Sequence, residues 1–170
     1  MSLHADLLEQ AFALALLERG KPKQASLRRA LSSAYYAFFH LLVSEGAALI
    51  GSKLGKEARI RLRRAFVHAD MKAVCASYAS TQSRFPPQIA SLLTFPLDAD
   101  LQALAALFLE LQERRHLADY DIASVFNRTD VLAQISALNV MFDKWARLRA
   151  SANAKIFLAD LLLRKSWSRQ

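Results

Sequence analysis

The stretch SLRRALSSAYYAFFHLLV, residues 26–43, decides the fold of this 170-residue chain. It holds no Gly or Pro, and the apolar residues Leu27, Leu31, Ala34, Phe38 and Leu42 recur at steps of three and four, as on one face of an α-helix. Other apolar residues cover much of the remaining helix surface. Because a helix that is apolar nearly all round is buried, we expect the rest of the chain to pack around it.

One polar edge interrupts this apolar surface. Arg29, Ser33, Tyr36 and His40 follow one another at spacings of four, three and four residues, so they share one side of the expected helix. A charge, a hydroxyl, a phenol and an imidazole aligned in this way could act together or satisfy one another. We therefore expect the function of the protein to lie near this edge.

The composition predicts an all-α protein. Hydrophobic residues make up 54% of the chain and charged residues 22%, which is typical of a globular protein and not of a disordered one. Four Gly and four Pro leave few turns, and no hairpin signal is present. We predict a single up-and-down bundle of about five helices in one domain over residues 1–170, with a core of about 3–150 and a C-terminal helix and basic tail over 151–170.

The expected helices cover residues 3–19, 56–79 and 98–118, and the central helix through residues 26–43 is expected to end near Gly46 and Gly51. A last helix starts near 129 and weakens around 151–153 before a final segment over 154–165. Residues 80–96 form the one long irregular segment, with one helical turn near 88–93. We expect Phe85, Leu92 and Phe95 to fold back onto the bundle. Long irregular segments are uncommon in compact domains and often functional.

The net charge of +8 makes a polyanion a plausible partner, nucleic acid first and an anionic membrane surface second. The most basic passage is KEARIRLRRAFVHADMK, residues 56–72. At helical spacing, one stripe holds Arg61, Arg64, His68 and Lys72, and the positive surface is extended by Lys56, Arg59 and Arg63. The side expected to face the core holds Ile60, Val67, Met71, Val74 and Tyr78. Such a stripe suits phosphate contacts, but a merely solvated helix face has the same pattern.

Several classes of site are not expected. The single cysteine, Cys75, excludes an intramolecular disulfide and a Cys-based zinc site, and we expect it to be a small buried residue. The carboxylates are scattered, so no metal and no cofactor are predicted. No apolar run reaches the roughly 20 residues of a membrane span, and the N-terminus does not read as a signal peptide. A cytoplasmic protein without a membrane partner is the default expectation.

A second stretch, LQERRHLADYD at residues 111–121, ends the predicted helix over 98–118. Taken together, an Arg-rich helix start leading into AYYAFFH (residues 34–40) and an Arg-rich segment ending in ADYD (residues 118–121) resemble the HEPN superfamily of small α-helical bundles. The resemblance covers about residues 3–150.

The resemblance implies a bundle of four or five helices that is commonly dimeric. Many HEPN proteins are metal-independent ribonucleases that use an Arg, four to six intervening residues and a His, and two such motifs meet across a dimer cleft. They occur in toxin–antitoxin and defence systems, frequently beside a nucleotidyltransferase. Others lack the motif and act as RNA-binding or scaffold modules. RNA or a nucleotide, a second copy of the chain and a nucleotidyltransferase are therefore the implied partners.

The sequence departs from the HEPN motif at the histidine. Four residues separate Arg114 from Asp119, which stands where the histidine would be, and His116 follows Arg114 too closely. An exposed aspartate, with a pKa near 3.9, is a poor base for taking the 2′-hydroxyl proton, whereas a histidine near 6.5 suits that role. The spacing is matched only in the basic passage, by Arg63 or Arg61 with His68.

If the HEPN site is retained, Arg114 and Arg115 would hold phosphate and Tyr36 and Tyr120 would position it. Proton transfer would fall to His40, His116 or Asp119. Further phosphate contacts would come from the remaining basic candidates, which are Arg29, Arg61, Arg63, Arg64 and His68. The expected function is thus RNA or nucleotide binding, with metal-independent RNA cleavage as its catalytic form.

The same residues also allow a structural interpretation. Arg115 and Asp119, four residues apart, could form a helix-end ion pair worth about 0.3–0.5 kcal/mol if exposed. Arg114 and Asp121 could join Tyr36 and Arg29 in a buried polar network. In that case the protein would be a structural homodimer, or an interaction module such as a regulatory subunit of a nucleotidyltransferase.

Overall fold

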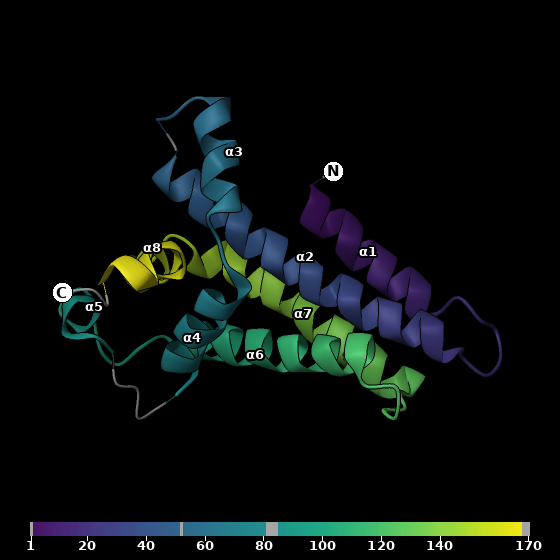
Figure 1. The fold of residues 1–170 in the computed structure, drawn as a ribbon. Helices are drawn as coiled ribbons and strands as arrows, with labels where there is room; N and C mark the ends of the chain where they lie inside the picture. The colour runs from purple at the N-terminus through teal and green to yellow at the C-terminus, as the bar shows by residue number, and fades with distance from the viewer. Residues whose placement is uncertain (1, 52, 81–84, 168–170) are drawn as a thin grey trace. The chain divides into compact units, whose positions relative to one another are not determined.

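The computed structural model describes residues 2–51, 53–80 and 85–167. These ranges form α-helices and no strand, which confirms the all-α prediction (Figure 1). The described helices number eight, so the prediction of about five is wrong; they are α1 (Leu3–Ala15), α2 (Gln24–Ile50), α3 (Lys56–Arg64), α4 (His68–Ala79), α5 (Pro87–Ala90), α6 (Ala99–Tyr120), α7 (Arg128–Leu148) and α8 (Ala152–Trp167). Residues 81–84 of the predicted irregular segment and 168–170 of the predicted tail lie outside the described residues.

The predicted helix over 56–79 is in fact two helices, α3 and α4. Val67 has an extended backbone (φ −116°, ψ 128°), and the preceding Phe66 is only 6% exposed. The Phe66 ring lies so close to Gly46 of α2 that a Cβ on Gly46 would come within 2.7 Å of it. Burial of Phe66 therefore accompanies the break, which a continuous amphipathic pattern did not reveal.

This break corrects two predictions. Arg61 and Arg64 lie on α3 whereas His68 begins α4, so these residues do not share one continuous helical stripe with Lys72. Ile60 and Val67 are 40% and 43% exposed and are not core residues. The predicted core positions on α4 are confirmed, since Met71, Val74 and Tyr78 are fully buried.

Other boundaries shift for local reasons. The first helix ends at Ala15 and not at residue 19. The central helix, α2, ends at Ile50, within the stretch from Gly46 to Gly51 that was expected to mark its end. The expected turn near 88–93 is α5, with Pro87 in its first turn, where a missing N–H costs nothing. Phe85 packs edge-on against Tyr78, with 4.9 Å between ring centroids, as the irregular segment was expected to do. Leu92 and Phe95, however, are 53% and 55% exposed.

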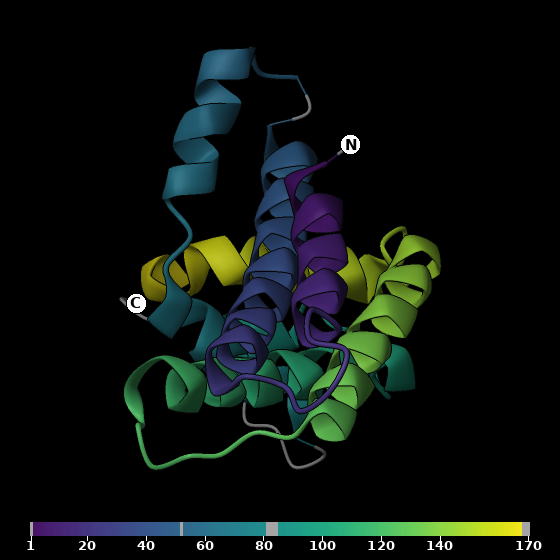
Figure 2. The ribbon, with the colours of Figure 1, turned by 90° about the vertical axis from the view of Figure 1, so that its right-hand side faces the viewer.

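The chain forms two compact units. The first comprises residues 1–41 and 107–143, and the second comprises residues 42–106 and 144–170. In the first unit, α1 runs alongside the first part of α2 (Figures 1 and 2). The expected apolar stripe of α2 is confirmed within this unit, because Leu27, Leu31, Ala34 and Phe38 are at most 1% exposed. The Phe38 ring packs against Phe108 of α6 at 5.6 Å.

In the second unit, α4 packs against α8. The Tyr78 ring meets that of Phe157 edge-on at 4.9 Å, and Cys75 lies fully buried nearby, as the sequence predicted. Burial raises the pKa of the Cys75 thiol, so this cysteine is neutral and unreactive as a nucleophile. Asp160 and Arg164 of α8 form an ion pair in the same region, with 2.6 Å between Oδ2 and Nη2.

One described helix, α2, is long and apolar enough to cross a membrane by length and composition. Its most apolar 18-residue window has a mean hydropathy of 1.2, although polar residues interrupt it. Of that window, 56% is buried inside the protein, and the core helix of a soluble protein meets the same criterion.

Candidate functional site

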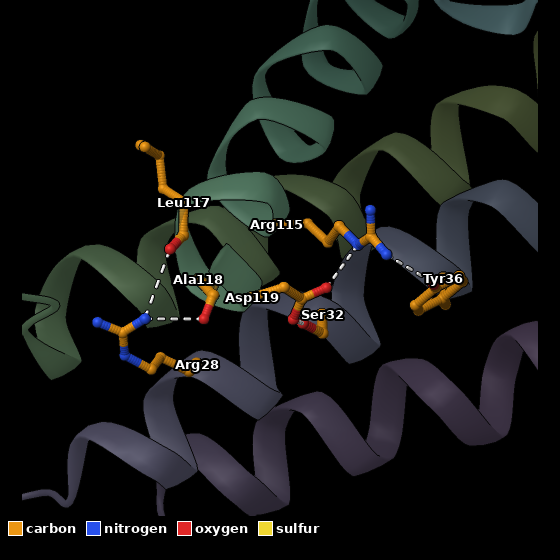
Figure 3. A network of polar contacts seen from close by, with 7 residues as sticks. All are labelled: Arg28, Ser32, Tyr36, Arg115, Leu117, Ala118 and Asp119. Carbon is orange, nitrogen blue, oxygen red and sulfur yellow. Dashed lines mark hydrogen bonds and ion pairs between the residues drawn. The ribbon is translucent and has the colours of Figure 1, made fainter. Parts of the chain in front are cut away.

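A polar network joins the end of α6 to α2 within the first unit (Figure 3). The Arg115 Nε atom lies 2.7 Å from Asp119 Oδ2, and Arg115 Nη2 donates a 2.9 Å hydrogen bond to the Tyr36 hydroxyl. The Ser32 hydroxyl donates to Asp119 Oδ1 at 2.5 Å. The Arg115–Asp119 ion pair is thus confirmed. The expected network of Arg114, Asp121, Tyr36 and Arg29 is wrong in all but Tyr36, because Arg115, Asp119 and Ser32 are the residues that meet there.

Aromatic rings surround the Arg115 guanidinium. Its central carbon lies 5.8, 5.5 and 5.7 Å from the ring centroids of Tyr35, Tyr36 and Tyr120, within the range of cation–π attraction. Burial alone would lower the pKa of Arg115, but the groups of Tyr36, Asp119 and Tyr120 outweigh it, and the pKa is raised. The guanidinium thus stays charged although its side chain is only 23% exposed.

The expected Arg115–Asp119 ion pair is partly buried and also joins α6 to α2 through Ser32 and Tyr36, so it is more than an exposed surface pair. The Nε–H bond of Arg115 is not aligned for a hydrogen bond, so the contact with Asp119 is electrostatic in character. Both oxygens of Asp119 are engaged, Oδ2 by the charge of Arg115 and Oδ1 by the hydrogen bond from Ser32. The Asp119 carboxylate therefore joins α6 to α2 through Ser32 and also holds the charge of Arg115 in place.

Another arginine, Arg28 of α2, caps the end of α6. Its guanidinium donates hydrogen bonds to the backbone oxygens of Ala118 (2.9 Å), Asp121 (3.0 Å) and Ser124 (2.6 Å). It also lies 5.4 Å from the centroid of the Phe126 ring. The last carbonyl groups of a helix lack intrahelical partners, and a cation there also opposes the negative end of the helix dipole.

Sequence reasoning missed Arg28 and chose its neighbour Arg29, which is exposed. The edge of α2 that faces the end of α6 is Arg28, Ser32 and Tyr36, at a regular spacing of four residues. The expected edge through Ser33 points elsewhere, because the Ser33 hydroxyl donates to Gln10 of α1 at 3.1 Å. The spacing of Arg28, Ser32 and Tyr36 is visible in the sequence, but spacing along one helix does not show which side of that helix faces α6.

Asp121, the last residue of the ADYD motif, belongs to the turn after α6 and not to the expected network. Its carboxylate accepts hydrogen bonds from the Ser124 hydroxyl (2.6 Å) and the Ala123 N–H (2.9 Å). These two bonds, the one from Ser124 first, hold the pKa of Asp121 below its usual range. The turn carries the backbone oxygens that Arg28 binds, so Asp121 supports the network indirectly.

The remaining motif residues do not converge on one reactive point. His40 is half-buried, with its ring 5.4 Å from that of Phe39 and 6.5 Å from that of Tyr36. His116 is exposed beside Tyr120, at 5.2 Å between ring centroids. Arg114 is half-exposed and takes no part in the hydrogen bonds and ion pairs of the described network.

The second unit carries a basic cavity of about 420 Å³ beside α3, which we call the α3 groove. Its lining consists of Ala47, Ala48, Lys56, Arg59, Ile60 and Arg63. Among the described residues, Lys56, Arg59 and Arg63 have no ion-pair partner. Its volume falls within the range of small-molecule sites, which is about 300–1,000 Å³.

The other basic candidates lie outside this groove. Arg61 is exposed and faces Glu57 at 3.8 Å, while Arg64 and His68 are also exposed. The match of Arg63 and His68 to the HEPN spacing is interrupted by residues 65–67, which are not helical. In the described ranges no group of three or more His, Cys, Asp or Glu side chains is placed to hold a metal ion.

In comparisons with known proteins, the chain matches no family model, no curated protein and no solved structure.

Proposed function

We propose that this chain is a HEPN-like protein that binds RNA through the phosphate backbone in its α3 groove. The observation that carries the proposal is a concave surface of about 420 Å³ lined by three cations, Lys56, Arg59 and Arg63, with no acidic side chain in the lining. Cations without acidic partners must attract counterions, and releasing those counterions is the main source of affinity for a nucleic-acid backbone. Contacts of this kind position the RNA without reading its sequence.

The groove is also partly preorganised. A Cβ on Gly51 would come within 2.8 Å of Arg59 Cγ and 3.1 Å of Leu62 Cδ1, so the aliphatic stem of Arg59 lies against the backbone at the end of α2. Packing of the stem restricts the rotamers of the side chain and reduces the entropy lost when its guanidinium binds an anion. Ile60 adds an apolar surface, 40% exposed, on which a sugar or a base can rest.

The relationship to HEPN proteins rests on the meeting of the two motifs in the first unit. AYYAFFH supplies Tyr36 and ADYD supplies Asp119, and both contact Arg115. Because Asp119 is engaged by Arg115 and Ser32, the geometry does not favour cleavage at this network, and the proposal places RNA in the α3 groove. The same proposal includes four further expectations, which follow from the resemblance or were expected by default. They are a homodimer, a nucleotidyltransferase partner, a role in a toxin–antitoxin or defence system and a cytoplasmic location.

The RNA-binding proposal predicts a salt-sensitive loss of affinity when the groove is neutralised. In the double variant Arg59→Gln/Arg63→Gln, affinity for a 20-nucleotide single-stranded RNA should fall roughly tenfold, which is about 1.4 kcal/mol. The slope of log affinity against log salt should shrink by about 1.4, because two phosphate contacts are lost. Fluorescence anisotropy titrations at several salt concentrations measure both quantities.

The matched control is Arg19→Gln/Lys21→Gln, which removes the same charge from exposed positions of the first unit. It should change affinity and slope far less than the groove variant. Equal losses in both double variants would reduce the binding to net charge alone, and no measurable binding of RNA by the natural protein would refute the proposal.

Cleavage is tested on the same RNA in EDTA, with the natural protein beside Arg114→Ala and Asp119→Ala. We expect intact RNA in all three samples on a denaturing gel, because the Asp119 carboxylate is already engaged by the charge of Arg115 and the hydroxyl of Ser32. Cleavage by the natural protein that is lost in both variants would instead assign a ribonuclease activity to Arg114 and Asp119.

A further inference from the structure

A second basic cavity lies next to the α3 groove on the same unit. It measures about 350 Å³ and is lined by Glu45, Ala48, Leu49, Arg149, Ala150, Lys155 and Leu158. The two cavities share one lining residue, Ala48 of α2. We call this second cavity the corner cavity, because Arg149 and Ala150 belong to the turn that joins α7 to α8.

The lining of the corner cavity has a net positive charge, although it includes Glu45. Arg149 Nη1 lies 3.0 Å from Glu45 Oε1, so these two charges offset each other. Lys155 has no ion-pair partner among the described residues and leaves a surplus of one positive charge. Together with Lys56, Arg59 and Arg63 of the α3 groove, the two adjoining cavities hold five cations and one carboxylate.

The cations of the corner cavity are held by ordered elements. The Arg149 N–H donates to the Trp145 oxygen at 2.9 Å, and the Trp145 side chain is only 2% exposed. Ser151 immediately precedes α8 and caps its start, with its hydroxyl accepting from the Ala154 N–H at 3.2 Å and its backbone oxygen accepting from the Lys155 N–H, also at 3.2 Å. Side chains on such elements hold a site more accurately than side chains on a mobile loop.

We infer that one RNA single strand binds both cavities, crossing from the α3 groove over Ala48 into the corner cavity. This inference rests on the proposed function and specifies its ligand. A single strand follows a positively charged groove with its backbone and leaves its bases free to contact apolar surfaces, which Ile60 and Leu49 provide here. A duplex keeps its bases stacked inside and is recognised across a much longer, shallow surface.

Ala48 is the point at which this inference is tested most sharply. Its side chain is small and its position is exposed, so a strand can pass over it, and a larger acidic residue there is compatible with an exposed helix position. Ala48→Glu would place a carboxylate between the two sets of cations. We expect affinity for the 20-nucleotide single strand to fall at least tenfold. The control Ala106→Glu, at an exposed position of α6, should bind as the natural protein does.

Lys155→Gln supplies the second, independent arm, because it leaves the ion pair of Glu45 with Arg149 intact. We expect weaker binding and a salt slope reduced by roughly 0.7, the value for one lost contact to a single strand. Circular dichroism melts of all variants show whether each one is folded at the temperature of the titrations.

The outcomes separate this inference from the function on which it rests. Losses in Arg59→Gln/Arg63→Gln without losses in Ala48→Glu or Lys155→Gln would overturn the two-cavity track and leave the α3 groove as the RNA site. No loss in any of these variants would overturn both. Equal affinity for a 20-base-pair RNA duplex would also overturn the single-strand assignment, and binding to phosphatidylserine vesicles in place of RNA would assign the surface to a membrane.

Discussion

Replacing Arg28 by Met should lower the free energy of unfolding by about 3 kcal/mol or more, because Arg28 caps the end of α6. The guanidinium donates to three backbone oxygens at 3.0 Å or less, those of Ala118, Asp121 and Ser124. Hydrogen bonds that involve a charged group contribute about 1.5–3 kcal/mol each, and partial exposure reduces that value here. Without Arg28, the end of α6 loses partners for its last carbonyl groups.

The neighbouring Arg29 is the matched control for this prediction. Arg29→Met removes the same charge one residue away, but Arg29 is exposed, and exposed substitutions usually change stability by no more than about 0.5 kcal/mol. Urea denaturation followed by circular dichroism measures both variants. If the two variants lost equal stability, the capping role of Arg28 would have to be abandoned.

Replacing Arg164 by Met should be comparably damaging, with a loss of about 3–5 kcal/mol near neutral pH. Asp160 is fully buried, and its Oδ2 atom accepts a 2.6 Å hydrogen bond from Arg164 Nη2, whose side chain is 13% exposed. Removing the cation leaves a buried carboxylate without its counter-charge, which is costly unless the carboxylate takes up a proton.

The deficit of the Arg164→Met variant should depend on pH. Burial raises the pKa of Asp160 to about 6, and the charge and hydrogen bond of Arg164 oppose this rise. A folded-state pKa above the unfolded value means that the folded protein binds the proton more tightly. The stability that this proton contributes is fully present below the unfolded value of 3.8 and is lost as the pH rises through about 6.

Without Arg164 the pKa of Asp160 rises further, so the loss should extend to higher pH. The variant should therefore be closest to the natural protein at acid pH and fall furthest behind it at neutral pH, as measured by urea denaturation across this range. The adjacent Lys165→Met is the control, because Lys165 is 64% exposed in its 3.1 Å pair with Asp70 and should contribute less than about 1 kcal/mol. A deficit that does not change with pH would contradict this account of Asp160.

The all-α class, the buried stripe of α2 and the contact between Arg115 and Asp119 could all be predicted from the amino-acid sequence. These features depend on residues three or four positions apart on one helix, and helical geometry alone brings such residues together. The burial of Cys75 could be predicted for the same reason, since its neighbours Met71, Val74 and Tyr78 have helical spacing. The relationship to HEPN proteins and the RNA-binding function stay predictions.

Features that depend on how separate elements meet could not be predicted in this way and came from the three-dimensional structure. It showed that Arg28 and not Arg29 reaches the end of α6, since one residue along a helix rotates a side chain to another face. The break between α3 and α4 accompanies burial of Phe66 beside Gly46, a contact between residues twenty positions apart. The cavities around Ala48 likewise combine α2 with α3 and α8, and no local pattern specifies such a distant pairing.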